Sequence, residues 1–301
     1  MSADSHPDTP TVNLEVTFWG TRGSIASPGA STVRFGGNTP CVEVRGANGQ
    51  RCILDAGTGI RALGLALLQD DAPIDTDLFL THFHWDHVQG LPFFAPAHAR
   101  STRIRVHAPA QERTSAAEVL AAQMTAPYFP VPFSELPGIE QVMEHDTEEW
   151  STSSFVVRAT RTCHPSRTLG YRVQSGGVAL VYIPDNEIGL LQDRGGETAY
   201  DELVAFCSGA DLLVHDAMYT PSEYLNKVGW GHSTYLQAAT LAVHAGIARL
   251  RLFHHAPERT DAQLERIVSE LQEHLLSNGA TLEVAAAEEG ERISLTPQIL
   301  K

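Results

Sequence analysis

Residues 81–87 read Thr-His-Phe-His-Trp-Asp-His, so three histidines and an aspartate fall within six positions. They follow residues 78–80, an apolar run that predicts a buried strand. His82 and His84 are two residues apart, and extended chain directs both to one side. Asp86 and His87 are adjacent, so a turn can aim both at a second, nearby point. Because imidazole and carboxylate groups bind zinc, iron and manganese, the segment predicts a metal site more readily than a histidine-rich surface turn.

Composition limits the class of protein. The chain has 301 residues, 43% of them hydrophobic and 7% aromatic, which is enough for a sizeable core. We expect one α/β domain over residues 1–301, with residues 1–12 as a flexible leader. The formal net charge is −15 and there is no run of Lys or Arg, which disfavours nucleic acid as a partner.

The compartment follows from what the sequence lacks. The start of the chain has no apolar signal segment, and no run approaches the roughly 20 apolar residues of a membrane span. Four cysteines occur without C-x-x-C spacing, which favours free thiols in a reducing compartment: Cys41, Cys52, Cys163 and Cys207. We therefore expect a cytoplasmic protein with no membrane partner.

Strand-like runs along the chain repeatedly end in a histidine or an aspartate. The runs at 155–160, 178–183, 212–214 and 250–253 lead to His164, Asp185, His215 and His254. Helical periodicity occurs at residues 60–69, 111–124, 234–245 and 261–277. The pattern predicts a β-sandwich that collects polar side chains at one edge, with helices outside.

The motif His82-x-His84-x-Asp86-His87 resembles the signature of the metallo-β-lactamase superfamily, with all four side chains at the expected offsets. The resemblance covers most of the chain and implies a four-layer αβ/βα sandwich (α/β, or α+β) of two similar halves. It also implies two divalent metal ions, with zinc expected and manganese or iron as alternatives. The first ion would be held by His82, His84 and His164, the second by Asp86, His87 and His254, and both by Asp185.

Two further positions are interpreted through the same resemblance. The superfamily's last ligand lies three residues before a proline, here Pro257, which favours His254 over His255 and leaves the role of His255 open. Asp55 ends a predicted strand, where the superfamily has an aspartate that supports the metal loop. A carboxylate there would accept the free N–H of a ligand histidine.

A second pair of motifs is similar to those of the ribonuclease Z-like phosphodiesterase branch: residues 215–218, His-Asp-Ala-Met, and 231–234, Gly-His-Ser-Thr. In that branch an acidic residue orients a histidine that protonates the leaving oxygen. These would be Asp216 and His232, which join Asp86 as the expected catalytic residues. The alternative is that Gly-His-Ser-Thr only starts a helix, capped by Ser233 or Thr234. The branch usually has Glu where this chain has Asp216, and the chain lacks a long basic insertion for gripping tRNA.

The resemblance thus implies a phosphodiesterase that cleaves a small or cyclic phosphodiester through a hydroxide bridging the two ions. Its expected partner is a small anionic substrate, and a homodimer is left open. The alternative is a hydrolase of a carbonyl substrate, a lactone, thioester or β-lactam, on the same metals. A tRNA 3′-processing endonuclease and a non-catalytic metal-binding subunit fit the charge and the complete ligand set less well. Residues 125–138, with three aromatics among three prolines, would form a lid or pocket wall, or else a plain surface loop.

Overall fold

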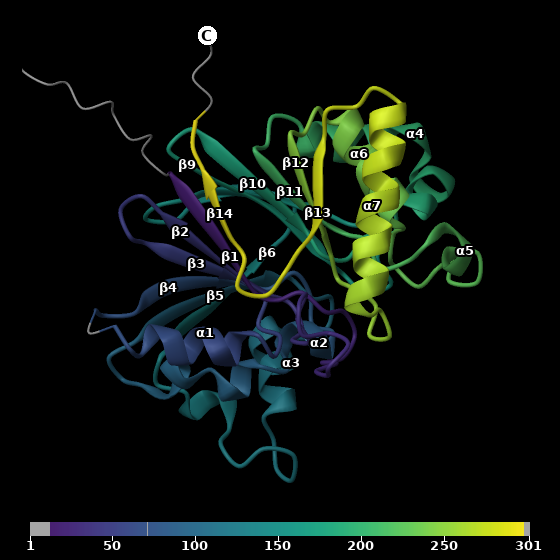
Figure 1. Ribbon diagram of the computed structural model, residues 1–301. Coiled ribbons are helices and arrows are strands. Elements are labelled where there is room, and N and C mark those ends of the chain that lie inside the picture. Colours follow the sequence, from purple (N-terminus) through teal and green to yellow (C-terminus); the bar gives the residue numbers. More distant parts are fainter. Residues whose placement is uncertain (1–12, 71, 298–301) are drawn as a thin grey trace, which may run out of the picture.

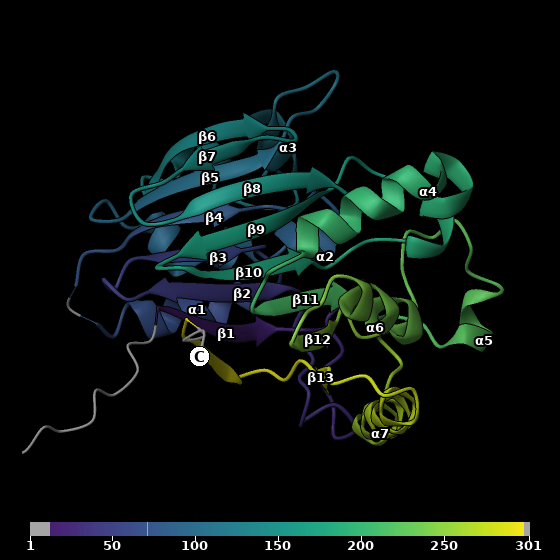
Figure 2. The ribbon, with the colours of Figure 1, turned by 90° about the horizontal axis from the view of Figure 1, so that it is seen from above.

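The computed structural model describes residues 13–70 and 72–297, with backbone alone at 192–197, so the expected leader at residues 1–12 lies outside the described residues. Two seven-stranded sheets face each other (Figures 1 and 2). The first has the order β14-β1-β2-β3-β4-β5-β6. Its strands are β1 (Leu14–Gly20), β2 (Cys41–Gly46), β3 (Arg51–Leu54), β4 (Asp75–Phe79), β5 (Arg103–Pro109), β6 (Ile139–His145) and β14 (Arg292–Leu295).

The second sheet has the order β13-β12-β11-β10-β9-β8-β7. Its strands are β7 (Glu149–Ser151), β8 (Val156–Arg161), β9 (Leu169–Ser175), β10 (Val178–Ile183), β11 (Leu212–Asp216), β12 (Arg249–Phe253) and β13 (Glu283–Ala286). Read from β14 and from β7, both sheets have three antiparallel pairings followed by three parallel ones. The two halves therefore share one topology, and β14 returns from the C-terminal end to complete the first sheet.

Helices cover the outer face of each sheet (Figure 1). The first sheet carries α1 (Ile60–Leu67) and α3 (Ala116–Gln123), and the second carries α4 (Ile188–Cys207), α6 (Tyr235–His244) and α7 (Asp261–Ser277). The remaining helices are short: α2 (Trp85–Val88), α5 (Pro221–Tyr224) and the 3-10 turns η1 (Leu91–Phe93), η2 (Ala95–His98) and η3 (Phe133–Glu135). None of the helices in the described ranges is long and apolar enough to cross a bilayer.

Three hydrophobic layers hold this arrangement together. One lies between the sheets and includes Phe18, Tyr171 and Phe253, all fully buried. The other two lie between each sheet and its own helices. This is the four-layer αβ/βα sandwich that the resemblance to the metallo-β-lactamase superfamily implies, and each sheet buries apolar side chains on both faces.

Most predicted elements are present, with two corrections. The helix expected from residue 111 begins at Ala116, because Ser115 caps it through a reciprocal bond pair with Glu118. The helix expected over residues 60–69 ends at Leu67, and Leu68, whose apolar side chain fits the buried face of that pattern, lies at the C-cap and is 48% exposed. The 20-residue helix α4 had no sequence prediction, because its centre is polar and contains Gly195 and Gly196, which weaken helical periodicity.

Strand register brings the predicted site residues to one edge. Leu54 in β3 lies beside Phe79 in β4, so Asp55 and Thr81 leave their strands next to each other. In the other half, Ile183 pairs with His215, and Asp216 pairs with Phe253. The residues that follow β10, β11 and β12 therefore meet at the carboxyl ends of parallel strands.

Candidate metal centre

The predicted ligands come from four connections between elements. Residues 81–87 leave β4 and enter the short helix α2. His164 follows β8, Asp185 follows β10, and His254 follows β12. The structure brings all seven predicted ligands into two adjoining groups.

The first group consists of His82, His84, His164 and Asp185, whose ligand atoms lie within 4.8 Å of one another. His164 Nε2 is 3.1 Å from His84 Nδ1. Asp185 Oδ2 is 3.6 Å from Nε2 of both His82 and His164.

The second group consists of Asp86, His87 and His254, and it uses the other oxygen of Asp185. Asp86 Oδ2 is 3.1 Å from His254 Nε2 and 3.4 Å from His87 Nε2. Asp185 Oδ1 is 3.2 Å from His87 Nε2 and 3.3 Å from His254 Nε2. Asp185 therefore offers one oxygen to each group, which is the geometry of a bridging carboxylate.

The donor atoms fit divalent metal ions. Two ligands at zinc–ligand distances around a tetrahedral ion lie about 3.3 Å apart, close to the separations here. Nε2 of His82, Nε2 of His87 and Oδ1 of Asp185 are buried without a hydrogen-bond partner among the described residues. Buried lone pairs directed at one another are costly unless a cation lies between them.

Asp55 orients the histidines from behind. Its carboxylate accepts hydrogen bonds from His87 Nδ1 (2.8 Å), the Thr81 backbone N–H (2.8 Å) and Tyr182 Oη (2.9 Å). His82 Nδ1 lies 3.0 Å from the Thr81 hydroxyl, which in turn bonds Asp55. The Nδ1 protons of both histidines are thus directed outward and the Nε2 lone pairs face the cluster, as the position of Asp55 in the sequence suggested.

Burial and charge set the protonation of the cluster. Burial lowers the pKa of His82, and the neighbouring His87 lowers it further. Burial also lowers the pKa values of His84 and His164, which keeps both imidazoles neutral, as ligands must be. At His87, burial opposes the charged form, but the carboxylates of Asp185 and Asp86 outweigh it and raise the pKa. The field at that position favours a positive charge.

Backbone strain is concentrated at the same edge. Among the described residues, the non-glycine positions with positive φ are Ser24 (63°), Asp55 (62°) and His254 (57°). The Ser24 N–H donates to Asp86 Oδ2 at 2.7 Å, so residues 20–24 place a backbone N–H on a carboxylate. Gly23 allows this approach, because a Cβ there would lie 2.2 Å from His254 Nδ1. Such strain persists where the surrounding structure enforces a functional geometry.

The second motif pair is joined in space. Asp216 Oδ2 lies 2.8 Å from His232 Nδ1, and this carboxylate also accepts the backbone N–H of Asn186 and of Met218. The His232 ring stacks on His254 with centroids 4.7 Å apart. Burial opposes the charged form of His232, but Asp216 outweighs it and raises the pKa of His232 to about 9. Thr234 caps α6, so this segment both starts a helix and positions His232.

His255 lies beside the centre but faces away from it. Its Nε2 donates to the Ala287 carbonyl at 2.9 Å, and its ring packs edge-on against Phe35. Burial lowers the pKa of His255 to about 3, so it is neutral. His255 thus fixes the connection after β12 while His254 joins the cluster.

Residues 125–138 form an irregular connection after α3 that contains η3. Phe129, Val131 and Phe133 pack against the core layer beneath the first sheet, whereas Tyr128 is 84% exposed. Phe129 also meets Phe93 of η1 edge-on, at a centroid distance of 5.6 Å. The segment is thus tied to the core through its aromatics, and its role as a lid stays a prediction.

Sequence reasoning missed one buried carboxylate, Glu187, two residues beyond Asp185. It accepts the backbone N–H of Gly229 (2.7 Å) and of Gly231 (2.6 Å), and the Tyr224 hydroxyl (2.8 Å). The Gly231 carbonyl in turn accepts His164 Nδ1 at 2.9 Å. A carboxylate two residues after a predicted ligand is a weak signal, because its partners lie about forty residues away.

Comparison with known proteins places this centre in a family. A model of the β-lactamase superfamily domain matches residues 50–255. The chain belongs to the metallo-β-lactamase superfamily. It is a metal-dependent hydrolase of that superfamily, as the sequence predicts.

Curated relatives agree with the branch that the sequence suggests. Ribonuclease Z of Haloarcula marismortui is 26% identical over 305 residues, covering 87% of this chain and 92% of the relative. Among solved structures, the metallo-β-lactamase fold protein YhfI from Bacillus subtilis aligns with a TM-score of 0.68 at 17% identity, covering 93% of this chain and 99% of YhfI. A diphosphatase from the PhnP family aligns with a TM-score of 0.64 at 16% identity, covering 94% and 98%. These two structures support the fold of the superfamily.

Proposed function

We propose that this member of the metallo-β-lactamase superfamily is a phosphodiesterase acting on a small or cyclic phosphodiester. The observation that carries the proposal is the His232–Asp216 pair beside the metal-ligand cluster. In this reading His82, His84, His164 and Asp185 hold one divalent ion, and Asp86, His87, His254 and Asp185 hold a second, with zinc expected. Such ions would activate a water molecule and stabilise negative charge on the phosphate.

The protein's own residues supply the remaining chemistry. Departure of an alkoxide from phosphorus requires a proton donor close to the leaving oxygen. Because Asp216 occupies His232 Nδ1 at 2.8 Å, the proton on Nε2 is the one available to a substrate. Asp216 also stabilises the protonated ring, so His232 can carry a proton at neutral pH. The Asp86 carboxylate lies between the rings of His87 and His254 and holds the second group of ligands together.

Two other substrates are alternatives. A lactone, thioester or β-lactam has no need of this proton donor, so His232 and Asp216 disfavour a carbonyl substrate. RNA is favoured by the name of the curated relatives, ribonuclease Z. The net charge of −15 and the absence of a Lys or Arg run weigh against a large polyanion.

The test is turnover of bis(p-nitrophenyl) phosphate, p-nitrophenyl acetate, a simple lactone and a precursor tRNA by protein of measured metal content. We expect cleavage of the phosphodiester, and its loss in the presence of a chelator. With adenylyl-adenosine, a diester whose leaving group is an alkoxide, His232→Ala should reduce turnover by about a hundredfold to ten-thousandfold, the range for a general acid, while metal content stays constant.

The matched control is His244→Ala, an exposed histidine at the end of α6 that contacts Tyr200. This variant should retain full turnover. Undiminished cleavage of adenylyl-adenosine in His232→Ala would remove His232 from the mechanism. Cleavage of the ester or lactone alone would replace the phosphodiesterase with the carbonyl hydrolase, and cleavage of the precursor tRNA alone would favour the ribonuclease.

A further inference from the structure

A cleft of about 530 Å³ adjoins the metal-ligand cluster and shares His164 with it. It lies between two connections, one from each half of the fold. Residues 111–114 lie between β5 and α3, and residues 161–168 run from the end of β8 to the start of β9. Because β5 runs parallel to β4, its carboxyl end lies at the same edge as the metal loop.

The cleft is basic in an otherwise acidic protein. Three arginines are among its lining residues, Arg113, Arg161 and Arg167. The carboxylates near them are Glu112, which also lines the cleft, and Asp146. Three positive groups therefore outnumber two negative ones, in a chain whose formal net charge is −15.

Asp146 holds two of the arginines in place. Its oxygens accept Arg161 Nε (2.9 Å) and Nη2 (2.8 Å), and also Arg167 Nη2 (2.6 Å). The Nε of Arg167 is buried without a hydrogen-bond partner among the described residues. Arg113 is exposed and makes no ion pair or hydrogen bond with described residues, so its fork of N–H groups is free. Arg161 and Arg167 are thus preorganised and Arg113 is free to pair, and guanidinium groups bind phosphate through paired charge-assisted hydrogen bonds.

We propose that the substrate is a phosphodiester that carries a second phosphate, and that Arg113, Arg161 and Arg167 bind this second phosphate while the diester lies at the metal-ligand cluster. The inference rests on the proposed phosphodiesterase activity and narrows its substrate class. His164 links the two sites, because its buried imidazole belongs to the cluster while the residue also lines the cleft, which places the arginines beside the proposed position of the diester.

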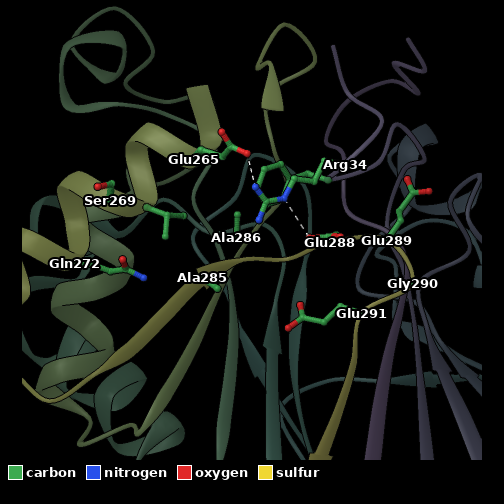
Figure 3. Close-up of a pocket in the computed structure, with 12 residues that line it drawn as sticks. Arg34, Glu265, Ser269, Gln272, Ala285, Ala286, Glu288, Glu289, Gly290 and Glu291 are labelled. Carbon is green, nitrogen blue, oxygen red and sulfur yellow. Dashed lines mark hydrogen bonds and ion pairs between the residues drawn. The ribbon is translucent and has the colours of Figure 1, made fainter. Parts of the chain in front are cut away.

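A second cleft shows that basic lining is not a general property of this surface. This second cleft has a volume of about 560 Å³ and lies between α7 and the connection from β13 to β14. Figure 3 shows its lining residues. There Arg34 is paired with Glu265 and with Glu288, and Glu289 and Glu291 add further carboxylates (Figure 3). This lining repels anions, whereas the cleft beside His164 attracts them.

The experiment compares three dinucleotides that share one phosphodiester: adenylyl-adenosine (ApA), its 5′-phosphorylated form (pApA) and its 3′-phosphorylated form (ApAp). KM and kcat are measured at fixed ionic strength with metal-loaded protein. We expect a KM about tenfold lower for pApA or for ApAp than for ApA, the size of one charge-assisted hydrogen bond. The preferred form tells which side of the diester faces the arginines. Calorimetric binding of the same three compounds to His232→Ala should show the same preference without turnover.

Arg113→Ala should bring the KM ratio between the phosphorylated and unphosphorylated substrates to about one. Arg167→Ala provides a second variant, and Arg266→Ala, an exposed arginine of α7, is the matched control that should keep the preference. Equal KM values for all three dinucleotides would overturn the inference and leave the phosphodiesterase intact. The inference would also be overturned if Arg113→Ala and Arg167→Ala both kept the preference for the phosphorylated dinucleotide. Equal loss of this preference in Arg266→Ala would overturn it as well. If none of the diesters is hydrolysed, the proposed function fails and this inference fails with it.

Discussion

Single side chains decide which nitrogen each buried histidine presents. His87 gives Nδ1 to Asp55, His164 gives Nδ1 to the Gly231 carbonyl, and each directs Nε2 at the cluster. His255 gives Nε2 to Ala287 and has no place in either ligand group. Neighbouring histidines therefore differ in function because their hydrogen-bond partners differ.

Glu187 accepts the Gly231 N–H, and the Gly231 carbonyl accepts His164 Nδ1, so Glu187 is connected to a predicted metal ligand through one residue. Glu187→Gln should therefore loosen the segment that positions His164. An amide cannot accept from both Gly229 and Gly231 as the carboxylate does, and hydrogen bonds to charged groups contribute about 1.5–3 kcal/mol. We expect affinity for one of the two proposed metal ions to fall by about tenfold to a hundredfold. Titration with a colorimetric metal indicator measures both affinities.

The control for Glu187 is Tyr224→Phe, which removes one bond to the same carboxylate and leaves the Gly231 contact. This variant should bind both ions normally. If Glu187→Gln lowered the affinity for both ions equally, and neither site filled at high metal concentration, the variant would be generally damaged. Glu187 would then have no specific role in positioning His164.

The predicted metal ligands lie in the connections after the strands rather than in the strands themselves. Among the described residues, the non-glycine positions with positive φ all lie beyond strand ends, at Ser24 after β1, at Asp55 after β3 and at His254 after β12. Residues 20–24 after β1 contribute an N–H to Asp86 and space for the ring of His254. The sheets thus act as a rigid frame on which short connections hold the ligands.

Gly23→Ala tests this packing. Its new Cβ would lie 2.2 Å from His254 Nδ1, so the ring must shift away from Asp86 and Asp185. We expect weaker binding of the ion that His254 would hold and a lower kcat, while the other ion is retained. Metal content and steady-state kinetics measure these effects. Gly29→Ala in the same connection has open space around it and should behave like the parent protein. Normal metal content in Gly23→Ala would show that the His254 ring tolerates displacement.

The fold as a whole is joined at the centre. The first half supplies His82, His84, Asp86 and His87, and the second half supplies His164, Asp185 and His254. The halves also meet where Tyr171 donates to the Leu80 carbonyl at 2.7 Å, directly before the metal loop. Ions bound by both halves would therefore stabilise the sandwich against unfolding.

Metal removal should accordingly lower thermal stability. A ligand at a hundred times its Kd stabilises a protein by about 2.7 kcal/mol, so chelation should lower Tm by roughly 5 °C or more. Calorimetry with and without chelator measures the shift. Asp185→Ala should contain fewer than two ions and show a smaller shift, because its carboxylate faces both groups. A Tm indifferent to chelator, in protein shown to contain metal, would contradict the role of the ions in joining the halves.

Local sequence was sufficient for much of this protein. The spacing of residues 82–87 is covalent, so the clustering of His82, Asp86 and His87 follows from the chain alone. Apolar runs that end in His or Asp indicated where His164, Asp185 and His254 would lie, because strand ends of one sheet share an edge. The resemblance of the motifs around Asp216 and His232 to those of the ribonuclease Z-like branch implied a contact between them, and the structure shows it at 2.8 Å.

Only the tertiary structure decided the contacts between distant segments. The N–H of Ser24 on Asp86, the hold of Glu187 on Gly231, and the direction of His255 join residues separated by about thirty to sixty positions. The basic cleft likewise needs Arg113 and Arg167, which lie on connections from different halves. Periodicity reports whether a residue is buried locally, whereas these contacts depend on sheet register and on the packing of the two sheets, and those depend on the whole chain at once.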